Sequence, residues 1–461
     1  ATGMNISVGR ISLSFPLNLV VTDVDAASPH NDTLLSVRRL QVNVQLLPLL
    51  KKQVEVDGIS LQGATVNSND LIHGMKLNGT LGELFISSHG VALDPETAIV
   101  NKVLLKDTDL SLCLNDTAAV DTAASDTTYW KIILQDIDLQ NVSFALDMPL
   151  DSLSLAASLD NAILRDGLID LHKSAYSLQT FRIKNGRVRY DSGKPLAADS
   201  LPSGLDPSHI ALTDIGVKLD SLYYEGRNMK AIISQFVLKE RSGVEIVSAT
   251  GRMVSNDKVL RVPSLKLETR DSYLELNAAM DWNALDFKGE GLVSARLMAD
   301  IGKPDVVRFM GRMDEKFVRQ YPSEPLRIRT GIDGDLNKLK LTTLTAELPG
   351  ALGLFARGEL THLTDSLLRG GDITLEAETK DLKFVSTLAE GIEIPYGTRL
   401  EGKFTMAGAK MGTDLLLMQP EAQAVAAADT IPITVYNDSI SVADDFKMER
   451  AARLFAKYDL S

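Results

Sequence analysis

The segment from Leu274 to Trp282, Leu-Glu-Leu-Asn-Ala-Ala-Met-Asp-Trp, decides the fold class of this protein. Leu274, Leu276, Ala278, Met280 and Trp282 occupy every second position, and polar residues fill most of the positions between them. Side chains of a β-strand point to alternate faces, so this period of two indicates a strand with one apolar and one polar face.

The same period recurs along nearly the whole chain. Further examples are Val142/Phe144/Leu146, Ile232/Ser234/Phe236/Leu238, Leu326/Ile328/Thr330 and Ile373/Leu375/Ala377. Asp57-Gly58, Asn185-Gly186 and Asp333-Gly334 predict turns that separate the strands. The sequence therefore predicts an all-β fold made of many amphipathic strands.

A short internal pattern accompanies the strands, with Asp or Asn two positions after an apolar residue and Leu or Val three positions later. It occurs at Leu105–Leu110, Leu134–Leu139, Ile183–Val188 and Leu212–Val217, with Asp107, Asp136, Asn185 and Asp214 at the Asp/Asn position. The Asp or Asn of this pattern shifts the alternation of apolar and polar residues by one position, as a turn or a β-bulge would. Recurrence at intervals of roughly 30 residues is typical of a repetitive body.

Helices and loops are few in this interpretation. We expect a helix at about 300–321, stopped by Pro322, a shorter one at 381–390, and loops at about 115–128 and 193–207. Residues 1–417 then form one repeating β segment, 418–450 a flexible insertion or loop, and 451–461 the start of a further, truncated repeat. The helices are expected to cover an open end or edge of the sheet.

Composition excludes several classes of protein. The 461 residues are 44% hydrophobic, which is ample for a buried core, and only 5% aromatic, with a net charge of −13. Neither nucleic acid nor anionic lipid headgroups are expected as partners, because phosphate binding needs a basic face. No run approaches the roughly 18 apolar residues that cross a bilayer, so the chain is either soluble or lacks its anchor. Its abrupt start and end suggest a fragment.

No pattern points to catalysis, a metal or a cofactor. The single cysteine, Cys113, excludes a disulfide, and the six histidines are scattered. Asp333-Gly334-Asp335 begins like a calcium loop, but Lys338 and Leu344 stand where glycine and a bidentate acid are required. An enzyme built on a β-helix is therefore disfavoured. We predict a protein that is not an enzyme, with no catalytic residue, metal or cofactor.

What remains is the apolar face of the strands. It is either an ordinary core filled by the protein's own side chains or the lining of an open trough that suits acyl chains. The pattern alone leaves both open. The candidate lining residues are Leu110, Leu112, Leu114, Val142, Phe144, Leu146, Ile183, Val188, Val217, Leu219, Phe236, Leu238, Leu265, Leu267, Leu274, Leu276, Met280, Leu326, Ile328, Leu339, Leu341, Ile373 and Leu375.

Several segments carry a resemblance to a known family. The opening Ile6–Leu17, followed by Asp32–Val37, is similar to the N-terminal portion of AsmA-like proteins, as is Leu46–Leu50 preceding Val54–Leu61. Within that family, Ile301–Pro322 and Leu326–Gly350 resemble the TamB-type proteins of Bacteroidetes-like bacteria. The resemblance covers most of residues 5–417, and its motifs are collectively more specific than any one of them.

The resemblance implies an elongated, strongly twisted and curled β-sheet that forms a groove, called a β-taco, with one or two short helices. About thirty strands at a spacing of ~4.8 Å would make a trough on the order of 140 Å long. The family further implies an inner-membrane anchor, a location in the periplasm of a Gram-negative bacterium, and a C-terminal domain that engages a TamA-like outer-membrane partner. Neither anchor nor that domain is visible in this sequence.

Two functions follow from this resemblance. The first is transfer of phospholipid, or another acyl lipid, between the inner and outer membranes. The second is a scaffold or chaperone that offers a sheet edge to nascent outer-membrane β-barrel strands by β-augmentation.

Overall fold

The computed structural model describes residues 5–14, 18–28, 33–44, 56–68, 74–92, 96–115, 129–193, 204–286, 291–311, 313–388, 397–408, 410–418 and 451–459. The chain divides into two compact units, residues 1–249 and 250–461, and each is described by itself. The expected insertion at 418–450 lies outside the described residues beyond Met418, as do 116–128 and 194–203 of the expected loops.

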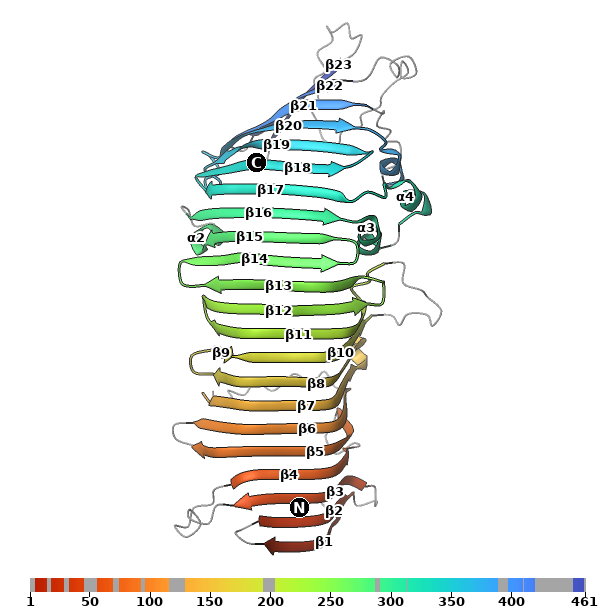
Figure 1. Cartoon of the computed structure of the whole chain (residues 1–461), viewed down its shortest axis with the longest axis vertical. Coiled ribbons are helices and arrows are strands. Elements are labelled where there is room, and N and C mark those ends of the chain that lie inside the picture. The colour runs from red at the N-terminus through yellow and green to blue at the C-terminus, as the bar shows by residue number, and fades with distance from the viewer. Residues whose placement is uncertain are drawn as a thin grey trace. The chain divides into compact units, whose positions relative to one another are not determined.

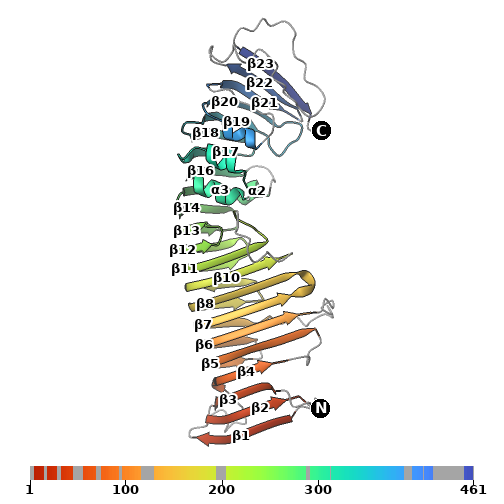
Figure 2. The same ribbon diagram turned by 90° about the vertical axis from the view of Figure 1, so that its right-hand side faces the viewer.

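Unit 1 consists of long strands that follow one another across the sheet (Figures 1 and 2). They are β1 (Asn5–Ser14), β2 (Asn18–Ala27), β3 (Thr33–Val44), β4 (Val56–Asn67), β5 (Met75–Ala92), β6 (Thr97–Leu114), β7 (Lys131–Met148), β8 (Leu153–Asp170), β9 (Ala175–Leu178), β10 (Thr180–Ser192), β11 (His209–Glu225) and β12 (Asn228–Glu240), with the 3-10 turn η1 (Pro149–Asp151) between β7 and β8. Strand β13 (Glu245–Ser255) has residues in both units.

Unit 2 continues with strands β14 (Val259–Thr269), β15 (Tyr273–Asp281), β16 (Leu292–Ile301), β17 (Leu326–Asp335), β18 (Lys338–Leu348), β19 (Leu352–Thr361), β20 (Gly370–Thr379), β21 (Arg399–Ala407), β22 (Lys410–Met418) and β23 (Ala451–Asp459). Its helices are α2 (Trp282–Leu285), α3 (Lys303–Met310) and α4 (Glu315–Gln320), with the 3-10 segment η2 (Lys383–Thr387). The predicted all-β class is confirmed. The described residues hold three short α-helices instead of one or two.

Neighbouring strands pair antiparallel in simple succession within both units, except that β6 and β7 run parallel. The short β9 pairs with β8 and β11, and β10 pairs with β8 beside it. Directly opposite residues of paired strands present their side chains on the same face of a sheet. The registers therefore show which side chains line up across the strands.

A line of left-handed backbone conformations crosses the strands of unit 1. Asp23 of β2, Gly63 of β4, Asp107 of β6, Asn141 of β7 and Asn185 of β10 all have φ between 49° and 62°. In the strands between them Arg38, Gly82 and Asp160 stand at the same position of the registers. Bulged residues bend a strand and sharpen its twist. We call this line the crease, because the whole set of strands bends along it.

The crease explains the internal Asp/Asn pattern of the sequence, with one correction. The pattern predicts a turn or bulge at each Asp or Asn. Asp107, Asn185 and Asp214 have a left-handed conformation within their strands, whereas Asp136 does not. In β7 the left-handed residue is Asn141, whose Nδ2 donates to Oδ1 of Asp107 at 2.9 Å. Asn141 lies opposite Asp107 in the register of β6 and β7, so the left-handed positions of the two strands are aligned.

The three predicted turns are wrong for a related reason. Asp57-Gly58, Asn185-Gly186 and Asp333-Gly334 all lie inside strands, namely β4, β10 and β17. Asn185 supplies the left-handed φ within the crease instead of a hairpin. The hairpin after β17 is formed two residues later, where Oδ1 of Asp335 accepts the backbone N–H groups of Asn337 and Lys338 at 2.8 Å. The period of two in β15 also ends earlier, because Trp282 begins α2.

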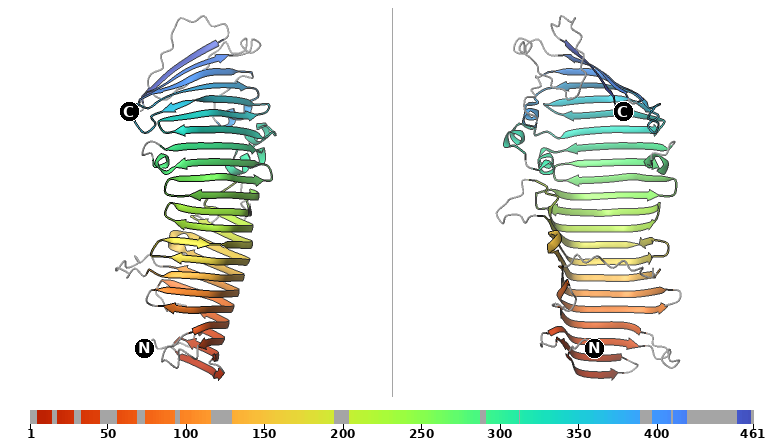
Figure 3. Two further views of the ribbon diagram at one scale, coloured as in Figure 1. Left: turned by 60° about the vertical axis from the view of Figure 1, so that its left-hand side comes forward. Right: turned by 180° about the vertical axis from the view of Figure 1, so that it is seen from behind.

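The helices of unit 2 lie at the edges of its sheet (Figure 3). The helix expected at 300–321 is two helices, α3 and α4, since strand β16 continues to Ile301 and Gly311 has a left-handed φ of 75°. The expected helix at 381–390 is the 3-10 segment η2. Phe317 of α4, Phe384 of η2 and Tyr321 form a buried aromatic cluster against Leu348 and Ala351. A second small core surrounds Ala284, Val293 and Leu336.

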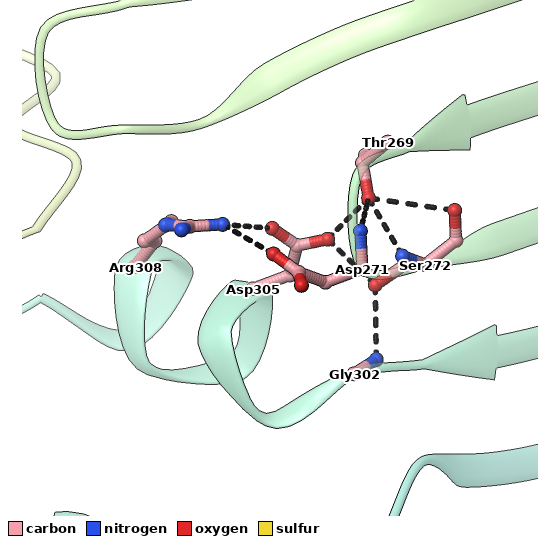
Figure 4. A network of polar contacts seen from close by, with 6 residues as sticks. All are labelled: Thr269, Asp271, Ser272, Gly302, Asp305 and Arg308. Carbon is pink, nitrogen blue, oxygen red and sulfur yellow. Dashed lines mark hydrogen bonds and ion pairs between the residues drawn. The ribbon is translucent and has the colours of Figure 1, made fainter.

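A buried carboxylate attaches α3 to the turn between β14 and β15 (Figure 4). Asp305 is 1% exposed, and its Oδ2 accepts from the hydroxyls of Thr269 and, at 2.6 Å, Ser272. The Ser272 hydroxyl in turn accepts from the Gly302 N–H at 3.0 Å. Arg308 completes the network at 3.0 Å from Asp305 and 2.8 Å from Asp271. Burial alone lowers the pKa of Arg308, but these hydrogen bonds outweigh it and raise that pKa above its ordinary value.

Candidate functional site: an apolar sheet face

The registers of unit 1 align apolar side chains in rows that run across the strands. One row takes a residue from each of β1–β8 and β10–β12: Ile11, Val21, Leu40, Leu61, Leu84, Leu105, Leu139, Ala162, Ile183, Val217 and Phe236. A second row on the same strands is Leu13, Leu19, Val42, Ile59, Ile86, Val103, Ile137, Leu164, Phe181, Leu219 and Ile233. Neither row is interrupted by a polar residue.

The apolar rows continue on the other side of the crease. The third row is Val8, Val24, Val37, Ala64, Leu81, Thr108, Val142, Leu159, Gly186 and Ile215. The fourth row, beyond it, is Ile6, Ala26, Leu35, Val66, Gly79, Leu110, Phe144, Ala157, Val188 and Leu212. A Cβ placed on Gly186 would lie 3.2 Å from Cγ2 of Ile183. Rows on both sides of the crease therefore belong to one face, which we call the apolar face.

The opposite face is polar beside these rows. Adjacent to the first row, but pointing the other way, stand Arg10, Thr22, Arg39, Gln62, Glu83, Lys106, Gln140, Asn161 and Lys184. We call this the outer face. On each of nine strands, a polar residue of this row is the chain neighbour of an aliphatic residue of the first row. The two faces are therefore chemically distinct.

Unit 2 has an apolar face of the same kind. One row across β14–β22 is Leu267, Leu274, Ala299, Ile328, Ala346, Leu354, Ala377, Leu400 and Leu417, and the next is Leu265, Leu276, Leu297, Thr330, Leu344, Ala356, Leu375, Gly402 and Leu415. The outer face of unit 2 carries cross-strand ion pairs, such as Arg329–Asp300 at 2.7 Å and Lys338–Glu359 at 3.1 Å.

All of the lining residues predicted from the sequence lie on these apolar faces. Some of them stand in the rows given above. The others are placed on the same face by their register partners or by the alternation of side chains along the strand. The predicted lining residues are half-buried, except Phe144, which is 38% exposed. None of them belongs to the fully buried core. In the first row of unit 1 only Ala162 is fully buried, at 3%, whereas Ile11 is 66% exposed. Contact of these residues with a lipid remains a prediction.

Hollows in the molecular surface are lined by residues of both faces. One of about 340 Å³ in unit 1 takes in Leu110, Phe144 and Val188 of the apolar rows together with outer-face residues such as Ser143 and Ala145. Another of about 410 Å³ in unit 2 involves Leu375 with Glu376, Glu401 and Lys403. The apolar face is an extended surface, and we place the candidate site there.

Within the described ranges no group of three or more His, Cys, Asp or Glu residues is placed to hold a metal ion. Nδ1 of His209 lies 2.9 Å from Oδ2 of Asp206. This hydrogen bond and that from the Ser208 N–H at 3.0 Å lower the pKa of Asp206. A hydrogen bond to Glu225 raises the pKa of the Tyr223 hydroxyl.

The helices of the described part are also short: none is long and apolar enough to span a membrane.

Comparison with protein-family models and with curated proteins finds no match. The likeness to AsmA-like proteins therefore rests on the sequence segments quoted above, and what it implies about function enters as a proposal.

Proposed function

We propose that this chain is a lipid-transfer segment of a cell-envelope protein, in which phospholipid acyl chains lie along the apolar face. The observation that carries the proposal is the pair of uninterrupted apolar rows in unit 1, from Ile11 to Phe236 and from Leu13 to Ile233. A row that stays apolar on every strand offers an acyl chain contact along its whole length.

The chemistry of the rows suits this ligand. An acyl chain needs apolar surface and forms no directional bonds, and each CH₂ removed from water contributes about 0.8 kcal/mol. Successive positions along a uniform row have nearly equal energy. A bound acyl chain can therefore slide from strand to strand without meeting a deep free-energy minimum. Transfer requires this property, whereas storage of a lipid does not.

Partial exposure of the rows supports the proposal over a filled core. Two stacked sheets would bury such side chains almost completely. Here Leu19 and Ile59, in the interior of the second row, remain 37% and 38% exposed. The surface is therefore accessible in the described part of unit 1, and the polar outer face keeps the other side wetted.

The cellular setting belongs to the same proposal. An AsmA-like protein of the TamB type would act in the periplasm of a Gram-negative bacterium and carry lipid between its two membranes, with a TamA-like outer-membrane partner. We assign no residue of this chain to that partner.

A pair of neighbouring substitutions in β7 tests the proposal. Leu139→Asp places a charge in the first apolar row, whereas Gln140→Asp places the same charge on the outer face. Phospholipid that co-purifies with the protein, quantified by native mass spectrometry, should fall for Leu139→Asp and stay unchanged for Gln140→Asp. Circular dichroism verifies that both variants keep their β content. Equal lipid content in the two folded variants would refute the proposal.

The corresponding test in unit 2 uses β15. Leu274→Asp and Leu276→Asp alter the apolar face, and Asn277→Asp serves as the outer-face control. Loss of lipid in unit 1 variants alone would restrict the ligand surface to the first unit.

One observation favours the second function, a scaffold for outer-membrane protein assembly. Within the described residues β1 pairs only with β2, and its Ile6, Ile11 and Leu13 are about two-thirds exposed, at 68%, 66% and 68%. An edge of this kind can accept another strand, from a client protein or from a further segment of the same protein. Photo-crosslinks from Ser7 or Ser12 to an unfolded outer-membrane barrel protein, in a variant that binds no lipid, would favour this function over transfer.

A further inference from the structure

Aromatic side chains gather at one edge of unit 1: four exposed tyrosines and the half-buried Trp130. Tyr129 and Trp130 precede β7, Tyr176 is the second residue of β9, and Tyr223 and Tyr224 lie near the end of β11. The chain has only ten Tyr and two Trp, so five of its twelve such residues occupy this one edge. It is the side on which β9 joins β8 and β12 follows β11 (Figure 1). We call it the aromatic edge.

Contacts join most of these residues into two groups, which the pairing of β7, β8, β9 and β11 brings to the same edge. The Leu171 N–H donates to the Trp130 carbonyl at 3.1 Å, and the rings of Tyr129 and His172 meet edge-on at 5.4 Å. Tyr176 and Tyr224 are opposite each other in the register of β9 and β11, and their ring centroids are 6.1 Å apart. Strands β7, β8, β9 and β11 therefore contribute to one surface.

The aromatic edge borders the apolar face. A second left-handed residue, Asp166, precedes Gly167 in β8, and a Cβ on Gly167 would lie 2.9 Å from Cδ2 of Leu164. Gly167 thus shares the face of Leu164, which belongs to the second apolar row. Ile169 follows on the same face by alternation and stands opposite Tyr176. The phenol rings of Tyr176 and Tyr224 accordingly end the apolar face at this edge.

Charge also distinguishes this edge from the other one. Lys131, Lys173, Arg227 and Lys230 lie at the aromatic edge. Its acids Glu96, Asp170 and Glu225 accept hydrogen bonds, from the Tyr129 N–H at 2.9 Å, from the Lys173 N–H at 3.0 Å and from the Tyr223 hydroxyl. The strand ends described at the opposite edge, from β5 to β13, hold one tyrosine, Tyr190, and no Trp. Acids outnumber cations there: the acids are Asp147, Asp151, Asp191, Asp206, Glu240 and Glu245, and the cations are Lys76, Arg189, Lys239 and Arg241.

We infer that the aromatic edge holds the glycerol and phosphate end of the lipid whose acyl chains lie on the apolar face of unit 1. This inference rests on the proposed function. Tyrosine and tryptophan combine an apolar ring with a polar tip, which matches the boundary between an acyl chain and its headgroup. Lysines attract the phosphate, and the acidic opposite edge repels it. The lipid therefore has one orientation across the strands.

Trp130 provides the readout. The full chain carrying Trp282→Phe has Trp130 as its one tryptophan, and its emission is measured with phosphatidylglycerol that bears a nitroxide either on the headgroup or near the end of an acyl chain. The headgroup label is expected to cause the larger loss of emission. A Trp130→Phe variant of the full chain, whose one tryptophan is Trp282 in unit 2, serves as the comparison, and circular dichroism confirms that the variants are folded.

The outcomes distinguish the inferred orientation of the lipid from the proposed function in lipid transfer. A larger loss from the acyl label, or equal losses, overturns the orientation and leaves lipid binding intact. No loss from either label, together with no lipid retained on the protein, overturns the proposed function and the inference with it. Tyr176→Leu combined with Tyr224→Leu should reduce the loss caused by the headgroup label, whereas Tyr190→Leu, within the apolar face near the opposite edge, should not.

Discussion

Oδ1 of Asp305 lies 3.0 Å from Nη1 of Arg308, one helical turn further along α3, and the carboxylate is almost completely removed from water. A buried charge persists only when its hydrogen-bonding capacity is filled. The hydroxyls of Thr269 and Ser272, in the β14–β15 turn, donate the remaining hydrogen bonds to the Asp305 carboxylate. The network around Asp305 therefore fixes α3 at the edge of the sheet in unit 2.

Asp305→Ala should therefore destabilise unit 2. Removing one partner of a buried ionic network costs about 3–5 kcal/mol. Glu315→Ala removes an exposed partner of Arg319 at 3.7 Å in α4 and should cost only about 0.3–0.5 kcal/mol. Urea unfolding followed by the fluorescence of Trp282 measures both. Equal midpoints for the two variants would show that the network does not hold α3.

The crease makes a prediction about single residues of β7. Asn141 has φ 51°, where a β-branched side chain is strained, so Asn141→Val should lower the free energy of unfolding by about 1–2 kcal/mol. Gln140→Val, at an extended position beside it, is the control and should be tolerated. Asn141→Gly should recover most of the loss, because glycine adopts this conformation freely. If Asn141→Val were as stable as Gln140→Val, the left-handed line would not require these residue types.

Two glycines of β19 differ in the space around them. A Cβ on Gly358 would lie 2.1 Å from the carbonyl oxygen of Asp372 in β20, whereas a Cβ on Gly353 would meet nothing within 4 Å. Gly358→Ala should therefore destabilise unit 2 by about 1–3 kcal/mol through forced displacement of the backbone. Gly353→Ala should be neutral or stabilising by up to about 1 kcal/mol. Thermal unfolding of the two variants makes the comparison, and the reverse order of stability would contradict the close approach of β19 and β20.

The Asp206–His209 pair gives a pH dependence. The pKa of Asp206 is lowered in the folded chain, so its carboxylate stabilises the fold above the unfolded pKa of about 3.9 and loses this effect as pH falls through the folded value. The melting temperature of Asp206→Asn should lie below that of the unaltered protein near pH 7, and the difference should shrink progressively below about pH 4. A difference that stays constant over this range would exclude the carboxylate's charge as its cause.

The sequence predicted the strands well because alternation is a local property. Leu274 and Leu276 reveal their common face without knowledge of any other strand. Turns were harder to predict, because the dipeptide Asn185-Gly186 is compatible with a hairpin turn and with a left-handed residue inside a strand. Only the alignment of Asn185 with Asp160 of β8 favours the left-handed residue inside the strand. The same dependence on neighbours explains why Asp136 matches the local pattern while Asn141 has the left-handed conformation.

The candidate site was predictable in part. The apolar residues could be identified from the sequence, but their assembly into uninterrupted rows depends on the register of every pair, including the parallel pair of β6 and β7. The aromatic edge could not have been recognised, because Tyr129, Tyr176 and Tyr224 are far apart in the chain and meet only through the pairing of β8, β9 and β11.

The crease has a consequence for how such a chain can change in length. Its residues share one register line from β2 to β10, so each strand of that region repeats the same bent profile. Insertion of a complete hairpin, with Asp, Asn or Gly on that line, would extend unit 1 while its cross-section stayed the same. A single-residue insertion would instead turn every following side chain of that strand to the wrong side. Natural variation in length should therefore proceed in whole hairpins.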